Sequence, residues 1–449
     1  MEARAPATLQ APLRRDAFSM FRALQRGASC SVFLDSAAAP APNASWSYLA
    51  AGDFPVLEAR DGAWPALTRA LPPRPRVGLA DGPPFRGGFL GMLGYDLARE
   101  FERIPRLAGD PLGLPRVWGL LVDALLAVDH RRGLVHAVAV PRPGEADKEA
   151  EARAYELLER AQGPVPGLRG RAAGGVARSS VGEPGYLEMV RRGKEFVDQG
   201  HVFQANLAHW LSWPSAAEPL WLFDRLRRGN PSPFAFYLDA GDWQLVSCSP
   251  ERLVQVEADR VATRPIAGTY PRGASEAEDA VQRERIRADP KERAEHTMLV
   301  DLERNDLGRV CRFGSVEVEE FMTTEEYSHV VHLVSSVAGG LRPGLGALDA
   351  VRACFPGGTI TGAPKVRAME VIEELEPQRR GFYTGSVGWV GFDGAADLNI
   401  VIRTILCKES ACHAPVGAGI VADSNPSREW RETLHKARAL LQAAGVEAP

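Results

Sequence analysis

Two pairs of glutamates offer the first chemistry in this sequence. Glu292 and Glu295 lie three apart in a segment with a helical pattern, and Glu429 and Glu432 repeat the spacing in another. Residues three apart share one face of a helix, so each pair presents two carboxylates together. Two such faces brought together would supply the hard oxygen ligands that Mg²⁺ prefers. The same spacing is also frequent on solvated helix faces, and spacing alone leaves both interpretations open.

A glycine-rich run at residues 355–365, Phe-Pro-Gly-Gly-Thr-Ile-Thr-Gly-Ala-Pro-Lys, could approach a small anion. Gly357 and Gly362 match the opening of a P-loop, but Ala363-Pro364 stands where that motif requires Lys and then Ser or Thr. The run is therefore not a nucleotide-binding loop. It could present backbone N–H groups and the Thr359 hydroxyl to an anion, or form only a tight turn before the next helix.

Other small motifs narrow the chemistry further. Gly417 and Gly419 precede a short apolar segment, where small residues either permit a ligand to approach the backbone or mark a bulge. His329 and His332 are three apart, but no further His or Cys follows at zinc-ligand spacing, which favours a structural pair. The sequence has no Gly-x-Ser-x-Gly nucleophile elbow and no dinucleotide-binding Gly-x-Gly-x-x-Gly after a strand.

Composition excludes several classes of function. Of 449 residues, 45% are apolar and 24% are charged, which is typical of a globular protein. A net charge of −4 gives no electrostatic footprint for nucleic acid or an anionic membrane. No apolar stretch is long enough to span a bilayer, and the first residues lack the apolar core of a signal peptide. The six cysteines lack Cys-x-x-Cys spacing, so we expect reduced thiols and a cytoplasmic protein.

The elements that must position these residues follow from hydrophobic periodicity. A Gly-, Pro- and Ala-rich segment at 163–184 predicts a linker or surface loop between an N-terminal region, 1–162, and a second region, 185–445. Strands are expected at 118–128, 134–140, 234–238, 243–248, 253–256, 385–392 and 399–406. Helices are expected at 148–161, 186–199, 279–306, 346–354, 365–375 and 429–444. This order predicts an α+β fold with extensive antiparallel sheet.

Several long motifs, in order along the chain, resemble those of the chorismate-utilising enzymes. They resemble most closely component I of aminodeoxychorismate synthase or of anthranilate synthase. The motifs are Gly87–Asp96, Ser-Pro-Glu-Arg at 249–252, Arg264–Thr269, His296–Arg309 and Phe355–Glu370. The resemblance implies a single large unit with two stacked antiparallel β-sheets flanked by helices, so that the two regions form one compact fold.

The resemblance also assigns roles to individual residues. It implies that Glu295 and Glu432 hold Mg²⁺ with support from Glu292 and Glu429, and that the ion binds the ring carboxylate of chorismate. Glu251 matches the general acid that protonates the departing C4 hydroxyl, and His332 matches an active-site histidine. The positions that match contacts to the substrate are Thr359, Tyr383, Arg403, Gly417, Gly419 and Lys436.

Gln204 bears on the choice of nucleophile. It stands where water-using relatives carry a lysine base, and a neutral amide cannot activate water in that way. Ammonia needs no such activation, so Gln204 favours amination. No glutaminase nucleophile motif is apparent in the sequence, so the resemblance implies a separate glutamine amidotransferase subunit as the source of ammonia.

The sequence motifs indicate the branch of the family less clearly than they indicate the family itself. Several flanking motifs, including Gln204–Leu207, resemble the aminodeoxychorismate synthases, which add nitrogen at C4. Many of these enzymes have a Lys, proposed to attack C2, where this sequence has Ala267, as in anthranilate synthases; alanine cannot be a nucleophile. We favour C4 amination, with anthranilate synthase as the alternative and a non-catalytic paralogue that binds an aromatic ligand as an alternative of another class. Leu34 and Ser36 resemble the lining of a tryptophan pocket found in both branches.

Overall fold

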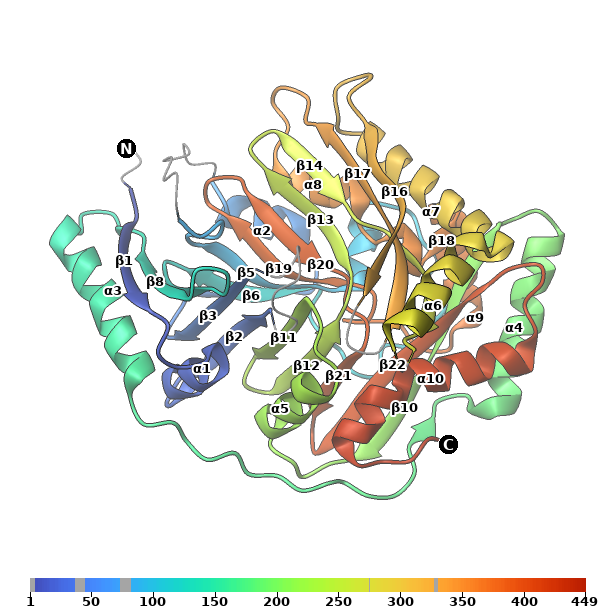
Figure 1. The fold of residues 1–449 in the computed structure, drawn as a ribbon, viewed down its shortest axis with the longest axis horizontal. Coiled ribbons are helices and arrows are strands. Elements are labelled where there is room, and N and C mark those ends of the chain that lie inside the picture. The colour runs from blue at the N-terminus through green and yellow to red at the C-terminus, as the bar shows by residue number, and fades with distance from the viewer. Residues whose placement is uncertain (1–4, 37–44, 73–81, 274, 327–329) are drawn as a thin grey trace.

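Two large antiparallel sheets are stacked face to face and flanked by helices in the computed structural model (Figure 1). The structure describes residues 5–36, 45–72, 82–273, 275–326 and 330–449. His329 therefore lies outside the described residues. The α+β fold with two stacked antiparallel sheets is confirmed.

The larger sheet has 12 strands and includes β-strands from both ends of the chain. β9 (Arg178–Ser179) pairs with β10 outside the main path. The other strands are, in spatial order, β1 (Ala7–Pro12), β8 (Leu134–Ala139), β7 (Ala124–Asp129), β3 (Trp46–Gly52), β2 (Cys30–Asp35), β11 (Phe234–Asp239), β12 (Trp243–Ser249), β21 (Thr404–Lys408), β22 (Ala411–Ile420), β10 (Gln204–Pro214) and β18 (Gly362–Ala363).

The second sheet has 10 strands and also mixes the two regions of the sequence. β16 (Glu317–Glu326) pairs with β17 beside the main path. The strand order is β15 (Ile266–Pro271), β17 (Val330–Gly340), β14 (Arg260–Thr263), β13 (Arg252–Glu257), β20 (Ala396–Asn399), β19 (Ser386–Gly391), β5 (Gly88–Leu93), β6 (Val117–Val122) and β4 (Val56–Ala59).

Three hydrophobic layers hold the fold together. Apolar side chains of both sheets, among them Trp118, Phe236 and Trp389, form the layer between the sheets. A second layer lies between the larger sheet and the helices that pack on it, which are α1 (Ala17–Gln25), α3 (Asp147–Gln162), α5 (Pro219–Gly229) and α10 (Pro426–Ala444). The third lies between the smaller sheet and α2 (Ala63–Ala70), α7 (Pro290–Gly308) and α8 (Ala347–Cys354). α4 (Gly182–Asp198) and α9 (Lys365–Leu375) pack against β10 and against each other.

Three of the segments that carry the chain from one sheet to the other lie within or between predicted strands. β6 and β7 were predicted as one strand at 118–128, but they belong to different sheets and break at Asp123. The predicted strand at 399–406 likewise separates into β20 and β21, with residues 400–403 between them. The third crossover joins β12 to β13 through Pro250 and Glu251. The sequence of an apolar run does not reveal where the chain changes sheet, because the residues on both sides of the break are buried.

The predicted helix at 279–306 is wrong in one respect: it is two helices, α6 (Glu276–Ala288) and α7. Asp289 separates them by capping α7, with its side chain accepting hydrogen bonds from the N–H groups of Lys291 and Glu292. Pro290 occupies the first turn of α7, where its missing N–H costs nothing.

The predicted linker at 163–184 is shorter than expected. Residues 163–177 lie outside helices and strands, but β9 and the first turn of α4 occupy the remainder. The segment follows the lower edge of the molecule in Figure 1. Backbone hydrogen bonds from Ala173, Gly174 and Ala177 tie it to the end of the chain at residues 444–447.

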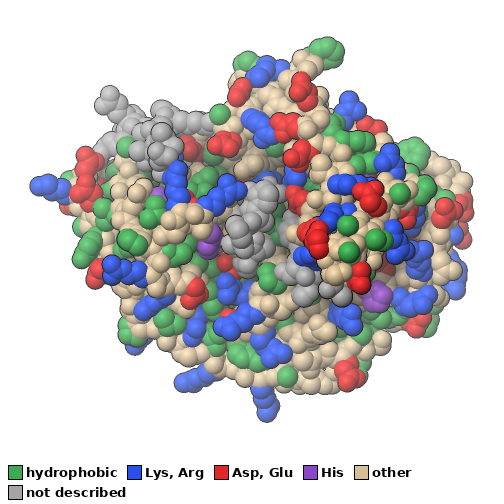
Figure 2. All heavy atoms as spheres, in the orientation of Figure 1, with side chains coloured by type: hydrophobic (Ala, Val, Ile, Leu, Met, Phe, Trp, Pro, Cys, Tyr) green, Lys and Arg blue, Asp and Glu red, His purple; other side chains and the backbone are tan. Residues whose placement is uncertain are grey.

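Charged side chains of both signs are interspersed over the face shown in Figure 2. None of the helices in the described ranges combines the length and the apolar character that a bilayer crossing requires.

Candidate active site

The two glutamate pairs lie at the beginnings of α7 and α10. Asn425 caps α10 by accepting a hydrogen bond from the N–H of Arg428, and Pro426 follows it in the first turn, as Pro290 does in α7. Each pair therefore starts in the first turn of a helix, with Glu292 in α7 and Glu429 in α10. The positive end of a helix dipole favours carboxylates at these positions.

Electrostatics joins the two pairs into one cluster. Burial, and then the charge of Glu295, raises the pKa of Glu292, and Glu432 on the other helix adds to the effect. Burial and the charge of Glu432 raise the pKa of Glu429. Like charges held together in this way favour a bound cation. The carboxylate oxygens of the four glutamates do not converge within 4.8 Å as a metal-ligand group in the described residues.

Lys436 lies at the rim of this cluster on α10. Its Nζ is 2.9 Å from a carboxylate oxygen of Glu432 and donates to the carbonyl of Gly417 at 3.0 Å. Against the raising effect of burial, this ammonium group lowers the pKa of Glu432. Lys436 thus joins α10 to β22, the strand that carries Gly417 and Gly419.

Gln204, at the first position of β10, connects this strand to the acidic cluster. Its Nε2 donates to Oε1 of Glu295 at 3.1 Å, while its own Oε1 is buried without a hydrogen-bond partner in the described structure. β10 pairs with β22, where Gly419 is opposite Asn206, and the side chain of Gln204 reaches Gly419. A Cβ at Gly419 would be 2.2 Å from Nε2 of Gln204, so only glycine leaves room for this amide.

Glu251 lies on the crossover from β12 to β13 and is 5% exposed. Burial raises the pKa of its carboxyl to about 7, against the lowering influence of Thr359 and Arg403. Thr359 is close enough to act on the pKa, yet neither its hydroxyl nor Oε1 of Glu251 makes a hydrogen bond in the described structure. Both groups are therefore available to a ligand, and Glu251 is suited to hold a proton near neutral pH.

Arg403 lies on the crossover between β20 and β21. Its φ of +50° is unusual for a residue with a side chain, and such strain persists only where the surroundings hold it. Here the carbonyl of Arg403 accepts a hydrogen bond from the N–H of Cys248 at 3.1 Å. A second bond, from the N–H of Ile400 to the carbonyl of Glu251, joins the same two crossovers. The acid and the guanidinium are thus held by paired backbone segments.

His332 and Ala267 come from the neighbouring strands β17 and β15. Nδ1 of His332 lies 3.3 Å from the carbonyl of Gly268. Burial, followed by the charge of Arg403, lowers the pKa of His332 to about 4, so its imidazole is neutral at pH 7. Ala267 is buried. A Cβ at Gly268 would lie 2.8 Å from Glu292, which brings this strand close to the acidic cluster.

Arg380 is a structural centre of the site that sequence reasoning missed. It is 2% exposed and forms a two-pronged ion pair with Glu376, at 2.7 and 3.1 Å. Its remaining donors reach the carbonyls of Ile360 and Asn206 and the hydroxyl of Thr384. The guanidinium also lies 5.7 Å from the ring centroid of Tyr383. Residues of opposite charge that lie four positions apart are common on exposed helices, so the spacing of Glu376 and Arg380 in the sequence did not indicate that the pair is buried.

Glu303 is a second buried carboxyl that the sequence did not single out. It lies on α7, two turns beyond Glu295, and its Oε2 has no hydrogen-bond partner in the described residues. Burial raises its pKa well above the ordinary range, and the nearby charge of Glu251 adds to this effect. Asp306, the next carboxyl on this face, pairs with Lys365 at 2.6 Å. Burial therefore favours the protonated form of Glu303, beside Glu251.

Leu34 and Ser36 lie in a different place from the other predicted residues. They line a cavity of about 210 Å³ between the two sheets. Aromatic side chains in its wall are those of Trp46, Tyr48, Phe234 and Trp389. The wall also contains Arg252, which forms a two-pronged pair with Asp397 at 2.9 and 3.0 Å and directly follows Glu251 in the chain.

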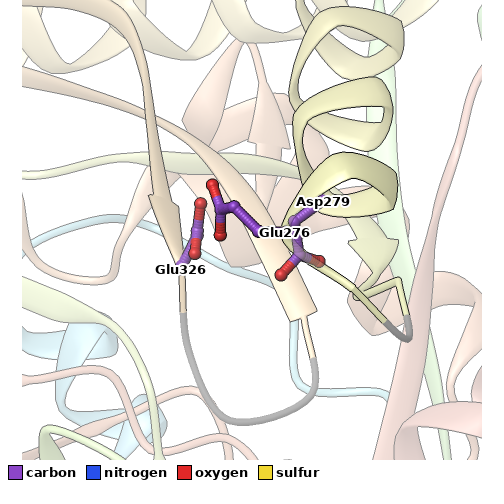
Figure 3. A group of neighbouring side chains, drawn as sticks. All are labelled: Glu276, Asp279 and Glu326. Carbon is purple, nitrogen blue, oxygen red and sulfur yellow. The ribbon is translucent and has the colours of Figure 1, made fainter.

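A third group of carboxylates lies outside the predicted site. Figure 3 shows Glu276 and Asp279 on α6 and Glu326 at the end of β16, and their oxygen atoms lie within 4.8 Å of one another. Arg272 pairs with Asp279 and Glu326, and Arg283 pairs with Glu276 and Glu326. These two guanidinium groups offset most of the charge of the three carboxylates, so we interpret the cluster as an ion-pair network.

Comparisons with known proteins agree with this geometry. Residues 40–442 match the family described as chorismate binding enzyme. The chain is 49% identical over 365 residues to anthranilate synthase component 1 of Thermus thermophilus, covering 81% of this chain and 78% of that protein. It is 43% identical over 366 residues to aminodeoxychorismate synthase component 1 of Bacillus subtilis, covering 80% and 77%. The solved structure of anthranilate synthase component I from Streptococcus pneumoniae TIGR4 has a TM-score of 0.79 at 31% identity, covering 89% of this chain and 92% of that one.

The raised pKa of Glu251 predicts a pH-dependent cost to stability. The folded protein holds this proton up to about pH 7, whereas the unfolded chain releases it near 4.5, so stability falls as pH rises between these values. Glu251→Gln has no proton to lose. We expect its free energy of unfolding, relative to wild type, to improve by up to about 3 kcal/mol from pH 4.5 to pH 8.

Urea unfolding at the two pH values measures this difference. The exposed Glu257, at the end of β13, offers a matched control, and Glu257→Gln should show no comparable change with pH. If Glu251→Gln changes the free energy of unfolding, relative to wild type, by the same amount at both pH values, the assignment of a raised pKa is contradicted.

Proposed function

Because this chain belongs to the family of chorismate-binding enzymes, we propose that it adds ammonia at C4 of chorismate to give 4-amino-4-deoxychorismate, the precursor of 4-aminobenzoate in folate biosynthesis. The coarser activity, amination of chorismate, follows from the family and its named relatives. In the proposal, the reaction depends on Mg²⁺, and a separate glutamine amidotransferase subunit supplies the ammonia. Gln204, in contact with Glu295, is the observation that supports amination most directly.

Gln204 cannot serve as a base. Its amide nitrogen already donates to Glu295, and an amide does not take up a proton near neutral pH. A water nucleophile would need such a base, whereas neutral ammonia is a stronger nucleophile and attacks without first losing a proton. The surroundings of Gln204 therefore favour ammonia as the group that attacks the ring.

Glu251 is the proposed general acid for the leaving group. With a pKa of about 7 it retains a proton in a large fraction of molecules at neutral pH. Donation of this proton to the C4 hydroxyl allows that group to leave as water when the new carbon–nitrogen bond is made. In this proposal Arg403 binds the pyruvyl carboxylate with two parallel hydrogen bonds, and Lys436 and Thr359 contact the substrate's carboxylates as well.

The four glutamates fit Mg²⁺ by the chemistry of their donors. They are hard oxygen ligands, and the pKa values of Glu292 and Glu429 are raised partly by neighbouring carboxylates that a cation would neutralise. We propose Glu295 and Glu432 as the principal ligands, with Glu292 and Glu429 beside them. When bound, the ion would offset the charge of the ring carboxylate and fix its orientation.

Anthranilate synthase component I is the second candidate function. Ala267 favours it, because a buried alanine at this position cannot form the lysine adduct proposed for many aminodeoxychorismate synthases. The similarity to relatives named anthranilate synthase points the same way. Under the proposed C4 amination, catalysis proceeds without an enzyme–lysine adduct at residue 267.

Product analysis separates the two reactions. We expect purified protein, incubated with chorismate, Mg²⁺ and ammonium, to give a product that yields 4-aminobenzoate only after addition of a lyase. Chromatography of the reaction mixture before and after addition of the lyase identifies the product. Anthranilate formed without any lyase would establish the second candidate and exclude the first.

Removal of one proposed metal ligand tests the assignment of Mg²⁺. Glu432→Ala should raise the Mg²⁺ concentration required for half-maximal activity by at least about tenfold, since even partners outside the ligand shell typically have effects of this size. Glu257→Ala, at an exposed glutamate of β13, is the control and should leave this concentration unchanged. A Glu432→Ala variant with wild-type dependence on Mg²⁺ would refute the assignment.

The cavity beside Leu34 and Ser36 is proposed to bind tryptophan. Its aromatic wall and the adjacent Arg252–Asp397 pair suit an aromatic amino acid. Binding to the folded state alone stabilises it, so saturating L-tryptophan at about 100 times its Kd should add about 2.7 kcal/mol and raise Tm. A thermal-shift titration measures this, with L-alanine as the control. An unchanged Tm at millimolar tryptophan would contradict the proposal.

A further inference from the structure

Two side-chain amides stand together at the start of β10, and only one of them was singled out from the sequence. Gln204 and Asn206 are two residues apart on a strand and therefore project from the same face. Asn206 pairs with Gly419 in β22, and a Cβ at Gly419 would lie 3.4 Å from Oδ1 of Asn206 and 2.2 Å from Nε2 of Gln204. The two amides thus flank Gly419.

Hydrogen bonds define which end of each amide faces the site. Nε2 of Gln204 donates to a carboxylate oxygen of Glu295, and Nδ2 of Asn206 donates to the carbonyl of Thr359, each at 3.1 Å. Both partners are acceptors only, so neither amide can be turned round without losing its bond. The amide oxygens are consequently the ends available to a ligand.

Both oxygens lack a donor within the described part of the chain. Oε1 of Gln204 is buried without a partner, and no hydrogen bond reaches Oδ1 of Asn206. Oε1 of Gln204 is buried, and a buried acceptor that stays unpaired costs about 1–3 kcal/mol, which a ligand with N–H donors would recover. The side chain of Asn206 is half-buried, so its Oδ1 is open to the same ligand. Ammonia has three N–H donors and one lone pair. Two acceptors can hold it through N–H groups and leave the lone pair free to attack.

We propose that Gln204 and Asn206 form the binding subsite for ammonia, with Oε1 and Oδ1 accepting hydrogen bonds from the nucleophile. This proposal rests on the proposed amination of chorismate and holds for attack at either ring carbon. Asn206 has a second role through its bond to Thr359, which positions the loop that faces Glu251. The two roles use different atoms of one side chain, so substitutions can separate them.

Steady-state kinetics with ammonium at fixed pH, varied against chorismate, tests the subsite. Asn206→Ala removes both atoms, and we expect KM for ammonia to rise about tenfold, as the loss of one hydrogen bond implies, together with KM for chorismate. Asn206→Asp keeps an acceptor but loses the donor to Thr359. For this variant we expect KM for ammonia to stay within about twofold of wild type while KM for chorismate rises.

Ser212→Ala provides a matched control on the same strand. Ser212 makes a hydrogen bond with His413 at 2.8 Å, far along β10 from Gln204, and its loss should leave both KM values unchanged. Thermal unfolding of each variant checks that it is folded. If Asn206→Ala does not fold, Asn206→Leu, which is similar in size and also lacks the acceptor, takes its place in the comparison with Asn206→Asp.

The outcomes distinguish this subsite from the proposed function. An unchanged KM for ammonia in Asn206→Ala, or an equal rise in Asn206→Asp and Asn206→Ala, would overturn the subsite and leave Asn206 as a support for Thr359. If the wild-type protein does not consume chorismate with ammonium at all, the proposed function fails and the subsite fails with it.

Discussion

Arg380 and Glu376 form a buried ion pair on which the geometry of the site depends. The five N–H donors of the guanidinium make five hydrogen bonds, and Glu376 also accepts the N–H of Ala208. These bonds join β10, the loop around Thr359 and the turn that contains Tyr383. Removal of one partner from such a pair typically costs about 3–5 kcal/mol, because it leaves a buried charge without compensation. The pair therefore holds three segments of the candidate site in a single arrangement.

The crossovers between the two sheets position Glu251 and Arg403 of the candidate site. Glu251 and Arg403 lie on two segments that pass from one sheet to the other, and backbone hydrogen bonds join these segments. Regular strands alternate their side chains between faces and satisfy their own backbone, so a residue that must project at the junction of two sheets has to leave the strand. Arg403, on one of these segments, has a φ of +50°.

Local patterns predicted the individual elements well where one physical signal dominated. The helix expected at 365–375 has these bounds in the structure, because its apolar face is regular and Pro364 precedes it. The runs at 118–128 and 399–406 were each predicted as one strand and proved to be two, in different sheets. Burial on both sides of a crossover gives continuous hydrophobicity, so periodicity cannot show the change of sheet. Glu303 and Arg380 could not be predicted for a related reason: in a sequence, a buried charge looks like an exposed one.

The sequence by itself determined the types of chemical group available: two glutamate pairs, an acid in Ser-Pro-Glu-Arg, a glutamine where a base would stand, and an alanine at residue 267. Its motifs also determined the family. Only the tertiary structure decided which of these groups interact, since Gln204 and Glu295 are 91 residues apart yet share a hydrogen bond. It alone decided the pKa of Glu251, because the largest cause of that raised pKa is burial of the carboxyl group. Spacing along a chain specifies the neighbours on one helix or strand, whereas desolvation and long-range contacts arise only when separate elements pack together.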